Sequence, residues 1–260
     1  MGSDPSEGPL ATVLRGTNPW WAGSPGPAVP TFRRWCFRHL LGLLDGGLAP
    51  GILRRGPRRV GKTILVRQMI DTLLARGVAP SRILYVPFDD LEGLRRRADP
   101  ILDVARWVET HVLGRPFNAA AQAGAPAYLF LDEVQNVANW SPQVKHLLDN
   151  HTLRAVLTGS SALRIEAGRD SLAGRVTTVE LGPLLLREIA GLRSGFDLPP
   201  VWEGGVHAAL RDPDFWRRAG RPATGRPATA CLRSGRSPSS APIRSPTGPS
   251  TRRGSRSPRS

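Results

Sequence analysis

The stretch from Gly56 to Thr63 constrains this chain more than any other. It reads Gly-Pro-Arg-Arg-Val-Gly-Lys-Thr and fits the pattern G-x-x-x-x-G-K-[ST] of phosphate-binding (Walker A) loops. Glycines in such a loop let consecutive backbone N–H groups curve around a phosphate, Lys62 can reach the β- and γ-phosphates, and the Thr63 hydroxyl can ligate Mg²⁺. We assign phosphate contact to Gly56, Pro57, Arg58, Arg59, Val60, Gly61, Lys62, Thr63 and Ile64.

The surroundings of this loop fit a strand–loop–helix unit. Ile52 and Leu53 lead into it, and apolar residues at helical spacing follow it. A helix that begins at Gly61 would add its positive N-terminal end to the bound anion. The chain has only two lysines, Lys62 and Lys145, so about 0.003 chance matches to the motif are expected. A nucleotide phosphate is therefore the predicted ligand.

Composition excludes several other classes of protein. With 260 residues, of which 40% are hydrophobic, the chain can bury a core. Cys36 and Cys231 lie too far apart in the sequence for a metal-binding spacing and form no disulfide framework. No apolar run approaches the length of a membrane span, and the first ten residues do not resemble a signal peptide. We expect a cytoplasmic protein without membrane contact.

The net charge of +15 is concentrated at one end of the chain. Nine arginines and no acidic residues occur from Ala219 to Ser260, which leaves about +6 for residues 1–218. Basicity alone therefore gives only weak support for nucleic acid as a partner of the folded part.

Apolar runs alternate with helical patterns from about residue 32 to residue 192. The pattern predicts strands at 51–55, 82–88, 127–131, 153–157 and 176–181, and helices at 32–44, 61–76, 101–113, 142–150 and 183–192. Such an alternation indicates a parallel sheet covered on both faces, which binds its ligand at the carboxyl ends of the strands. The polar groups at 56–63, 89–90, 132–133 and 158–161 follow predicted strands and would meet at that edge.

Asp132 and Glu133, which end the third predicted strand, resemble the acidic (Walker B) half of an ATPase site. Asp132 would hold Mg²⁺ through its water shell, and Glu133 would orient and deprotonate the water that attacks the γ-phosphate. An adjacent glutamate is typical of the phosphate-loop ATPases that carry their own base. That class predicts a three-layer α/β fold with a five-stranded parallel sheet of order 5-1-4-3-2.

Three further residues are candidates for the catalytic site. Thr158 and Ser160 follow the fourth strand and could contact the γ-phosphate or the attacking water, or could merely form a turn before the next helix. Arg175 could neutralise charge in its own chain or in a neighbouring subunit, although a surface role is nearly as well supported. The catalytic set is thus Lys62, Glu133, Thr158, Ser160 and Arg175, with Thr63 and Asp132 at the metal.

The chain divides into four predicted parts. Residues 1–30 form a largely irregular extension in which Trp20 and Trp21 act either as a clasp on the domain surface or as a lid over the adenine. Residues 31–195 form the AAA+ phosphate-loop ATPase domain, and residues 196–218 are the start of a truncated helical C-terminal region. Residues 219–260 contain almost no aliphatic residues and are expected to be disordered. This tail is either a basic segment that binds nucleic acid weakly or the product of a shifted reading frame, which we favour.

An ordered series of motifs resembles one family. It comprises Asn18-Pro-Trp-Trp, the phosphate loop, Phe88-Asp-Asp, Phe130-Leu-Asp-Glu-Val-Gln, Trp140 with Lys145-His-Leu-Leu-Asp, Leu157-Thr-Gly-Ser-Ser, Ser171-Leu-Ala-Gly-Arg and Leu181-Gly-Pro-Leu with Glu188. Over about residues 12–218 the chain resembles AAA+ proteins of bacteria and archaea that pair an AAA module with a C-terminal DUF4143 domain. The resemblance implies binding of ATP and Mg²⁺, slow hydrolysis and a regulatory or mechanical role with an undefined protein client. The sequence departs from the family pattern after residue 218.

The leading functional hypothesis is an AAA+ ATPase module with an unknown client, which could self-associate. The alternatives are a nucleotide-binding switch or truncated fragment without useful turnover, and a nucleic-acid-binding protein that uses its tail. A small-molecule kinase is less well supported, because no substrate lid with further arginines is evident between the strands.

Overall fold

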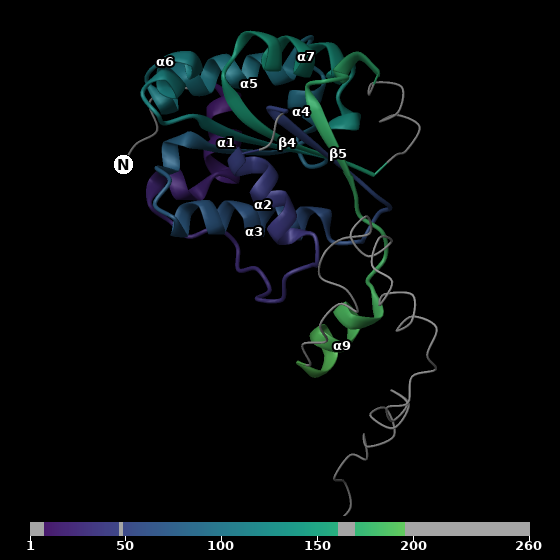
Figure 1. Ribbon diagram of the computed structural model, residues 1–260. Helices are drawn as coiled ribbons and strands as arrows, with labels where there is room; N and C mark the ends of the chain where they lie inside the picture. Colours follow the sequence, from purple (N-terminus) through teal and green to yellow (C-terminus); the bar gives the residue numbers. More distant parts are fainter. Residues whose placement is uncertain (1–7, 47–48, 161–169, 196–260) are drawn as a thin grey trace, which may run out of the picture. The chain divides into compact units, whose positions relative to one another are not determined.

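A five-stranded parallel sheet forms the centre of the fold in the computed structural model, which describes residues 8–46, 49–160 and 170–195. The strands lie in the order β2-β3-β4-β1-β5 (Figure 1), which is the predicted order counted from the other edge. They are β1 (Gly51–Arg55), β2 (Ile83–Pro87), β3 (Ala127–Asp132), β4 (Leu153–Gly159) and β5 (Val176–Glu180). The predicted α/β fold of the phosphate-loop class is confirmed; its predicted disordered tail lies outside the described residues.

Helices cover both faces of this sheet. Figure 1 shows α2 (Phe37–Gly46) and α3 (Lys62–Ala75) on one face, and α5 (Pro100–Val108), α6 (Phe117–Gln122) and α7 (Trp140–Asn150) on the other. Successive strand residues point to opposite faces, so Ile52 packs with α2 and α3 while Leu53 packs with α5 and α7. Both faces are therefore buried, as expected of a parallel sheet. The other helices are α1 (Pro9–Thr17), α4 (Glu92–Arg95) and α9 (Leu186–Ser194).

The amino-terminal part of the described chain differs from the prediction. Residues 8–30 were expected to be largely irregular, yet they contain α1 and the short 3-10 helix Pro19–Ala22, because Leu14 is buried in the core. The helix expected from Phe32 begins only at Phe37. The backbone carbonyls before Phe37 form hydrogen bonds with another element instead of within a helix: Gln68 of α3 donates to the carbonyls of Pro30 and Phe32.

The N-terminal segment (residues 8–32) covers β2, which is an edge strand. Asn18 is buried, its Nδ2 donates to the Tyr85 carbonyl (2.9 Å), and its Oδ1 accepts from the Tyr85 N–H (2.7 Å). The indole N–H groups of Trp20 and Trp21 both donate to the carbonyl of Ile83 (3.0 and 2.9 Å). These side chains satisfy edge groups that a neighbouring strand would otherwise pair. The two tryptophans thus act as a clasp on this edge of the sheet.

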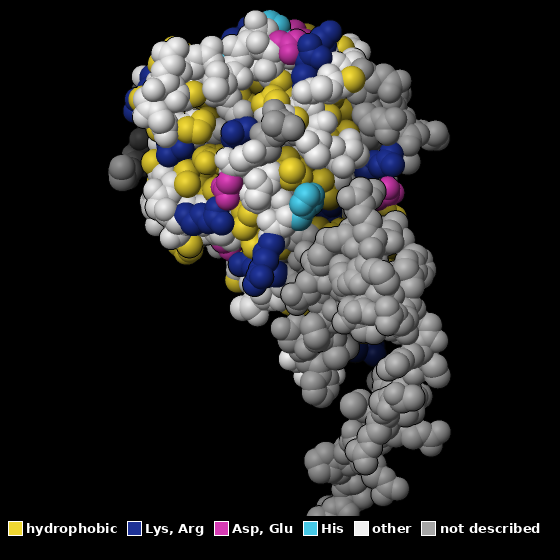
Figure 2. Space-filling model, viewed as in Figure 1, with side chains coloured by type: hydrophobic (Ala, Val, Ile, Leu, Met, Phe, Trp, Pro, Cys, Tyr) yellow, Lys and Arg dark blue, Asp and Glu magenta, His cyan; other side chains and the backbone are white. Residues whose placement is uncertain are grey.

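The visible face of the described residues gives little support for a nucleic-acid interface. On the face shown in Figure 2, basic and acidic side chains are scattered among apolar ones. The basic tail lies outside the described residues. Within the described ranges, no helix is long and apolar enough to cross a membrane.

Candidate nucleotide site

The phosphate loop connects the end of β1 to the start of α3, and its glycines meet two different demands. Gly61 has φ 91°, in the left-handed region that disfavours a side chain, and Arg59 also has a positive φ of 63°. Gly56 has no side chain because the carbonyl oxygen of Leu181 would lie only 2.2 Å from its Cβ. The motif therefore combines a turn requirement with a close approach to the chain that leaves β5.

Lys62 is held in the interior of the loop. Its side chain is almost fully buried, and its ammonium group donates to the carbonyls of Gly56 (3.2 Å) and Pro57 (2.9 Å). It also lies 3.4 Å from Oε1 of Glu133. A buried cation is costly unless it is paired. The two carbonyls and the carboxylate of Glu133 therefore stabilise the positive charge of Lys62 inside the loop, where a phosphate would bind. A phosphate that enters the loop would compete with these partners for Lys62.

Asp132 is the centre of a buried hydrogen-bond network. Its Oδ2 accepts from the Thr63 hydroxyl (2.8 Å) and from the Tyr85 hydroxyl (3.1 Å), and its Oδ1 accepts from the Thr158 hydroxyl. These four side chains come from α3, β2, β3 and β4, so the network ties together three strands and the helix after the loop. The result is a carboxylate fixed in direct contact with the first hydroxyl of α3.

This pair of oxygen ligands fits Mg²⁺. Magnesium prefers hard oxygen ligands and is usually held by one or two protein groups together with waters and substrate phosphates. Thr63 and Asp132 supply a hydroxyl and a carboxylate next to the loop. No group of three or more His, Cys, Asp or Glu side chains that could hold a metal occurs in the part of the chain that the structure describes. A cation at this place would therefore depend on the phosphates.

Glu133 sits beside this network in an uncommon backbone conformation. Its φ is 53°, and its backbone N–H donates to the Thr158 hydroxyl (2.9 Å). The carboxylate Oε2 accepts from Ser160 (2.7 Å) and from Gln135 (2.6 Å). Burial raises the pKa of Glu133, but these two hydrogen bonds and the charge of Lys62 outweigh it and hold the pKa below its ordinary value. The carboxylate is ionised and positioned beside the loop lysine.

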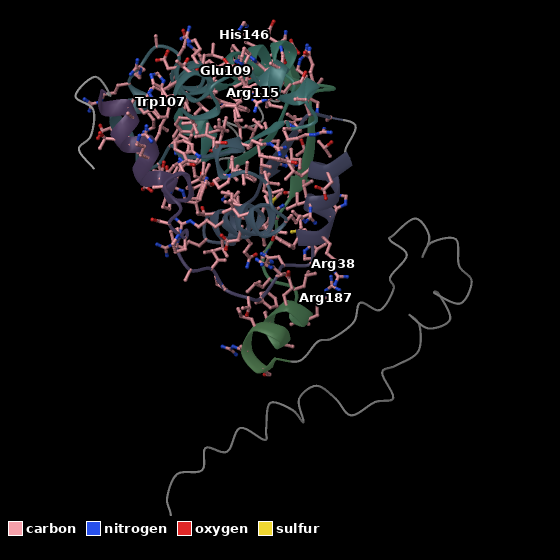
Figure 3. The ribbon with its side chains drawn as sticks, turned by 90° about the vertical axis from the view of Figure 1, so that its left-hand side faces the viewer. Arg38, Trp107, Glu109, Arg115, His146 and Arg187 are labelled. Atoms are coloured by element: carbon pink, nitrogen blue, oxygen red, sulfur yellow. The ribbon has the colours of Figure 1, made fainter. Side chains whose placement is uncertain are left out.

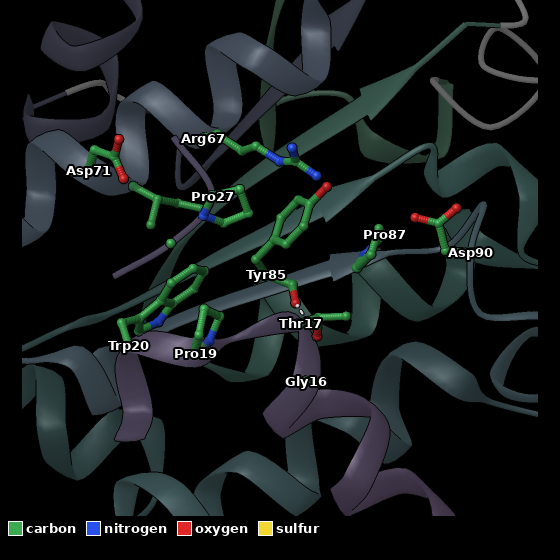
Figure 4. A pocket seen from close by; sticks show the side chains of 12 residues that line it. Gly16, Thr17, Pro19, Trp20, Pro27, Arg67, Asp71, Tyr85, Pro87 and Asp90 are labelled. Atoms are coloured by element: carbon green, nitrogen blue, oxygen red, sulfur yellow. Dashed lines mark hydrogen bonds between the residues drawn. The ribbon is translucent and has the colours of Figure 1, made fainter. Parts of the chain in front are cut away.

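Tyr85 is a site residue that the sequence did not reveal. Burial, together with the negative charge of Asp132, raises the pKa of its hydroxyl, which therefore stays protonated and donates to Asp132. In Figure 4 the same hydroxyl points toward the guanidinium of Arg67, at a cavity of about 200 Å³ between the N-terminal segment and α3. In the sequence Tyr85 resembles any other apolar position of β2, so only the register of β2 against β3 could identify it.

An apolar hollow of about 490 Å³ opens next to the phosphate loop, between α3 and the chain around α9. Its apolar lining comes from the N-terminal segment, the loop, α3 and the chain around α9, namely Phe32, Val60, Ile64, Leu184, Ile189 and Leu192. Several of these side chains are exposed, among them Ile64 and Leu192. The hollow has the chemistry of a site for a flat, apolar ring next to a phosphate site.

A buried ion pair connects the phosphate loop to α9. Arg34 forms a two-point pair with Glu188 (2.7 and 2.9 Å) and donates to the carbonyl of Val60 in the loop (2.8 Å). Burial raises the pKa of Glu188, but the hydrogen bonds from Arg34 and from two backbone N–H groups outweigh it, so the pKa lies below its ordinary value. Figure 3 shows α9, with Arg187, on the far side of the sheet from Trp107 and His146 of α5 and α7. The Arg34–Glu188 pair therefore lies next to the phosphate loop, on the opposite side of the sheet from α5 and α7.

The structure brings most of the predicted site residues together. Lys62, Thr63, Asp132, Glu133, Thr158 and Ser160 are linked by the contacts described above. Thr158 is fully buried within β4 and orients Asp132 and Glu133, so it forms no exposed turn. Arg175 is separate from them: it precedes β5 at the amino ends of the strands and pairs with Asp149 of α7.

The fold and the site define a phosphate-loop nucleotide-binding protein of the AAA type. A family model described as an AAA domain matches residues 50–190, more than half of the chain. The chain therefore belongs to this family of AAA domains.

Similar proteins occur in bacteria and archaea. The chain is 29% identical over 139 residues to an uncharacterized protein of Haemophilus influenzae, a match that covers 51% of this chain and 31% of the relative. It is 29% identical over 152 residues to an uncharacterized protein of Methanocaldococcus jannaschii and 28% identical over 162 residues to one of Mycobacterium tuberculosis. Each of these two matches covers 58% of this chain and 30% of the relative. The chain thus spans about a third of the length of the curated relatives it matches.

Proposed function

We propose that this chain is an ATPase module that binds MgATP and hydrolyses it to ADP and phosphate. The observation that carries the proposal is the meeting of Lys62, Thr63, Asp132 and Glu133 at the carboxyl ends of β1 and β3. A phosphate loop alone supports nucleotide binding; an ionised carboxylate next to the loop lysine adds a base for hydrolysis.

Each group of residues has a separate role in this proposal. The Lys62 ammonium and the backbone N–H groups of residues 56–64, Pro57 excepted because proline has no N–H, bind the phosphates, while Thr63 and Asp132 hold Mg²⁺. When bound, Mg²⁺ neutralises charge on the phosphate oxygens. The apolar hollow beside the loop receives the adenine. Tyr85 and Thr158 keep Asp132 in place through their hydroxyls.

Glu133 supports the chemical step as general base. The oxygen of a water attacks the γ-phosphorus, a proton of that water passes to Glu133, and the bond from the γ-phosphorus to the bridging oxygen breaks, so that ADP leaves. Ser160 and Gln135 already hold one carboxylate oxygen. The other oxygen faces Lys62, and it becomes available when Lys62 turns to the phosphates.

The two lysines of the chain allow a matched test. Lys62→Ala should abolish ATP binding in calorimetry, whereas Lys145→Ala, on the surface of α7, should bind as the wild type does. Glu133→Gln should retain ATP but release phosphate at least about 100-fold more slowly. Wild-type protein that binds ATP and releases no phosphate at any protein concentration would contradict the ATPase, and turnover that survives in Glu133→Gln would remove Glu133 from the mechanism.

A second function, a nucleotide-dependent switch without useful turnover, is favoured by the Arg34 pair. This pair joins the loop carbonyl of Val60 to Glu188 on α9, so a loop that rearranges around a phosphate would act on the start of the following region. Such a region would bind an unidentified protein client. ATP binding that alters protease cleavage after α9, with no phosphate release, would support the switch over the ATPase.

The proposed organisation along the chain follows from the same site. Residues 31–195 form the nucleotide-binding domain, and the segment before it covers β2. Residues 196–218 begin a further region, which, like the predicted tail at 219–260, lies outside the described residues.

A further inference from the structure

Gln135 contacts the proposed base, Glu133, from outside the phosphate loop and the Asp132–Glu133 pair. It lies in the 3-10 helix Val134–Asn136, which begins directly after the left-handed residue Glu133. That sharp turn folds the chain back, so the Gln135 side chain returns to its neighbour two positions earlier. Its Nε2 donates to Glu133 Oε2 at 2.6 Å and lies 3.4 Å from the Ser160 hydroxyl.

The orientation of the Gln135 amide is fixed by its partner. An ionised carboxylate only accepts hydrogen bonds, so the NH₂ end of the amide must face Glu133. The oxygen Oε1 then points into a buried region and has no hydrogen-bond partner among the described residues. The side chain is only 6% exposed. A buried acceptor without a donor destabilises a fold, and an apolar side chain of the same shape would not carry that penalty.

Gln135 is therefore poorly suited to stabilise the fold and well suited to hold Glu133. Ser160 and Gln135 donate to the same oxygen, Oε2, from two directions. The second oxygen, Oε1, is left toward Lys62 at 3.4 Å. With one oxygen held by two donors, the carboxylate cannot rotate to pair with Lys62 through both oxygens.

We propose that Gln135 is a positioning residue that, together with Ser160, clamps Oε2 of Glu133 and leaves Oε1 as the oxygen that accepts the proton of the attacking water. This inference rests on the proposed ATPase function and extends it to a residue outside the phosphate loop and the Asp132–Glu133 pair. Gln135 touches neither the phosphates nor the metal in this scheme; it acts only through Glu133. Its loss should therefore affect the chemical step and leave binding unchanged.

The test compares Gln135→Met with Gln143→Met, which removes another buried glutamine, in α7 on the opposite face of the sheet from α3. Gln135→Met should lower kcat about 10- to 100-fold, with KM and the Kd for ATP within about twofold of the wild type. Its melting temperature should be unchanged or higher. Gln143 satisfies backbone groups at Ile101 and Ala138, so Gln143→Met should lower the melting temperature and leave kcat unchanged.

Ser160 provides the second arm. If both residues serve one clamp, adding Ser160→Ala to Gln135→Met should lower kcat by much less than the product of the two separate effects. A wild-type kcat in Gln135→Met would overturn the clamp, and so would a loss of kcat accompanied by a fall in melting temperature as large as that of Gln143→Met. Either result would leave the ATPase proposal intact.

Absence of turnover in the wild type would defeat the proposed function, and the clamp is then decided by crystallography. In nucleotide-free Gln135→Met, the carboxylate of Glu133 should leave Ser160 and pair with Lys62 through both oxygens. A Glu133 side chain that keeps its position in that variant would overturn the clamp whether or not the protein hydrolyses ATP.

Discussion

The two ends of the parallel sheet carry charged residues in opposite ways. At the carboxyl ends of the strands, Lys62 and Asp132 are 4% and 3% exposed, and each has several hydrogen-bond partners. At the amino ends, Arg175 and Asp149 form an exposed ion pair with one another. Buried charges need their partners because water cannot replace them, whereas exposed pairs are screened and contribute little. Changes at the carboxyl ends of the strands should therefore lower stability, and changes at the amino ends should have almost no effect.

The largest effect on stability is expected at the Arg34–Glu188 pair near the phosphate loop. The two side chains are 8% and 3% exposed. Glu188→Ala should lower the free energy of unfolding by about 3–5 kcal/mol, because Arg34 would then be buried without its carboxylate. Urea denaturation of the full chain measures this change. The double variant Arg34→Met with Glu188→Leu should be less destabilised than Glu188→Ala, since it leaves no unpaired charge.

The pH dependence of stability gives a second test of this pair. Because the pKa of Glu188 lies below its ordinary value, the stabilisation is fully present above the unfolded-state pKa of about 4.3 and disappears as the pH falls through the lower folded-state pKa. As the pH falls from above the unfolded-state pKa down through the lower folded-state pKa, the wild type should lose more stability than Glu188→Ala. Equal losses would show that the pair contributes nothing.

Sequence patterns predicted the centre of this fold better than its periphery. The runs around Leu53 and Leu129 are bounded by turn signals, and strand–helix alternation then fixes a parallel sheet with its ligand edge. The same rule brought Lys62, Asp132 and Glu133 to one edge. The helix at Pro9–Thr17 was not predicted because its few apolar residues give a weak local signal. Tertiary packing against the core stabilises it.

Side chains that act through other side chains could not be predicted. Tyr85 and Gln135 contact Asp132 and Glu133 only because β2 lies next to β3 and because Glu133 adopts a positive φ. Neither the register nor the backbone angle is encoded in a local pattern. Arg34 is a stronger example, since its partner Glu188 lies 154 positions later in the chain.

A smaller effect on stability is expected when alanine replaces a glycine, and its sign should depend on whether backbone lies close to the new methyl group. Gly56→Ala should lower the free energy of unfolding by about 1–3 kcal/mol, because the added methyl group would press against backbone at Leu181 and the loop must shift. Gly42→Ala, in open space on α2, should instead raise it by about 0.5–1 kcal/mol. Thermal unfolding of both variants measures the difference. An unchanged Gly56→Ala protein would mean that the loop tolerates displacement and that its first glycine serves only the phosphate.

The smallest effect on stability is expected at Arg175. Arg175→Ala should leave the melting temperature unchanged, as should the control Arg97→Ala, which breaks another exposed ion pair. Arg175 cannot serve the loop of its own chain from this position. Its carbonyl accepts from the N–H of Gly51 at the start of β1, and a five-residue strand separates that point from the loop by about 16 Å.

Any catalytic role of Arg175 must therefore be exerted in a neighbouring subunit, and this role can be isolated by mixing. Lys62→Ala subunits lack a working phosphate loop but retain Arg175, while Arg175→Ala subunits have the reverse defect. If Arg175 acts between subunits, an equal mixture should release phosphate faster than the sum of the two proteins alone, and the excess should grow with protein concentration. The mixture of Lys62→Ala with Arg97→Ala sets the level without such rescue. A strictly additive mixture, with Arg175→Ala as active as Arg97→Ala, would reduce Arg175 to the exposed partner of Asp149 and leave the whole of the chemistry at the carboxyl end of the sheet.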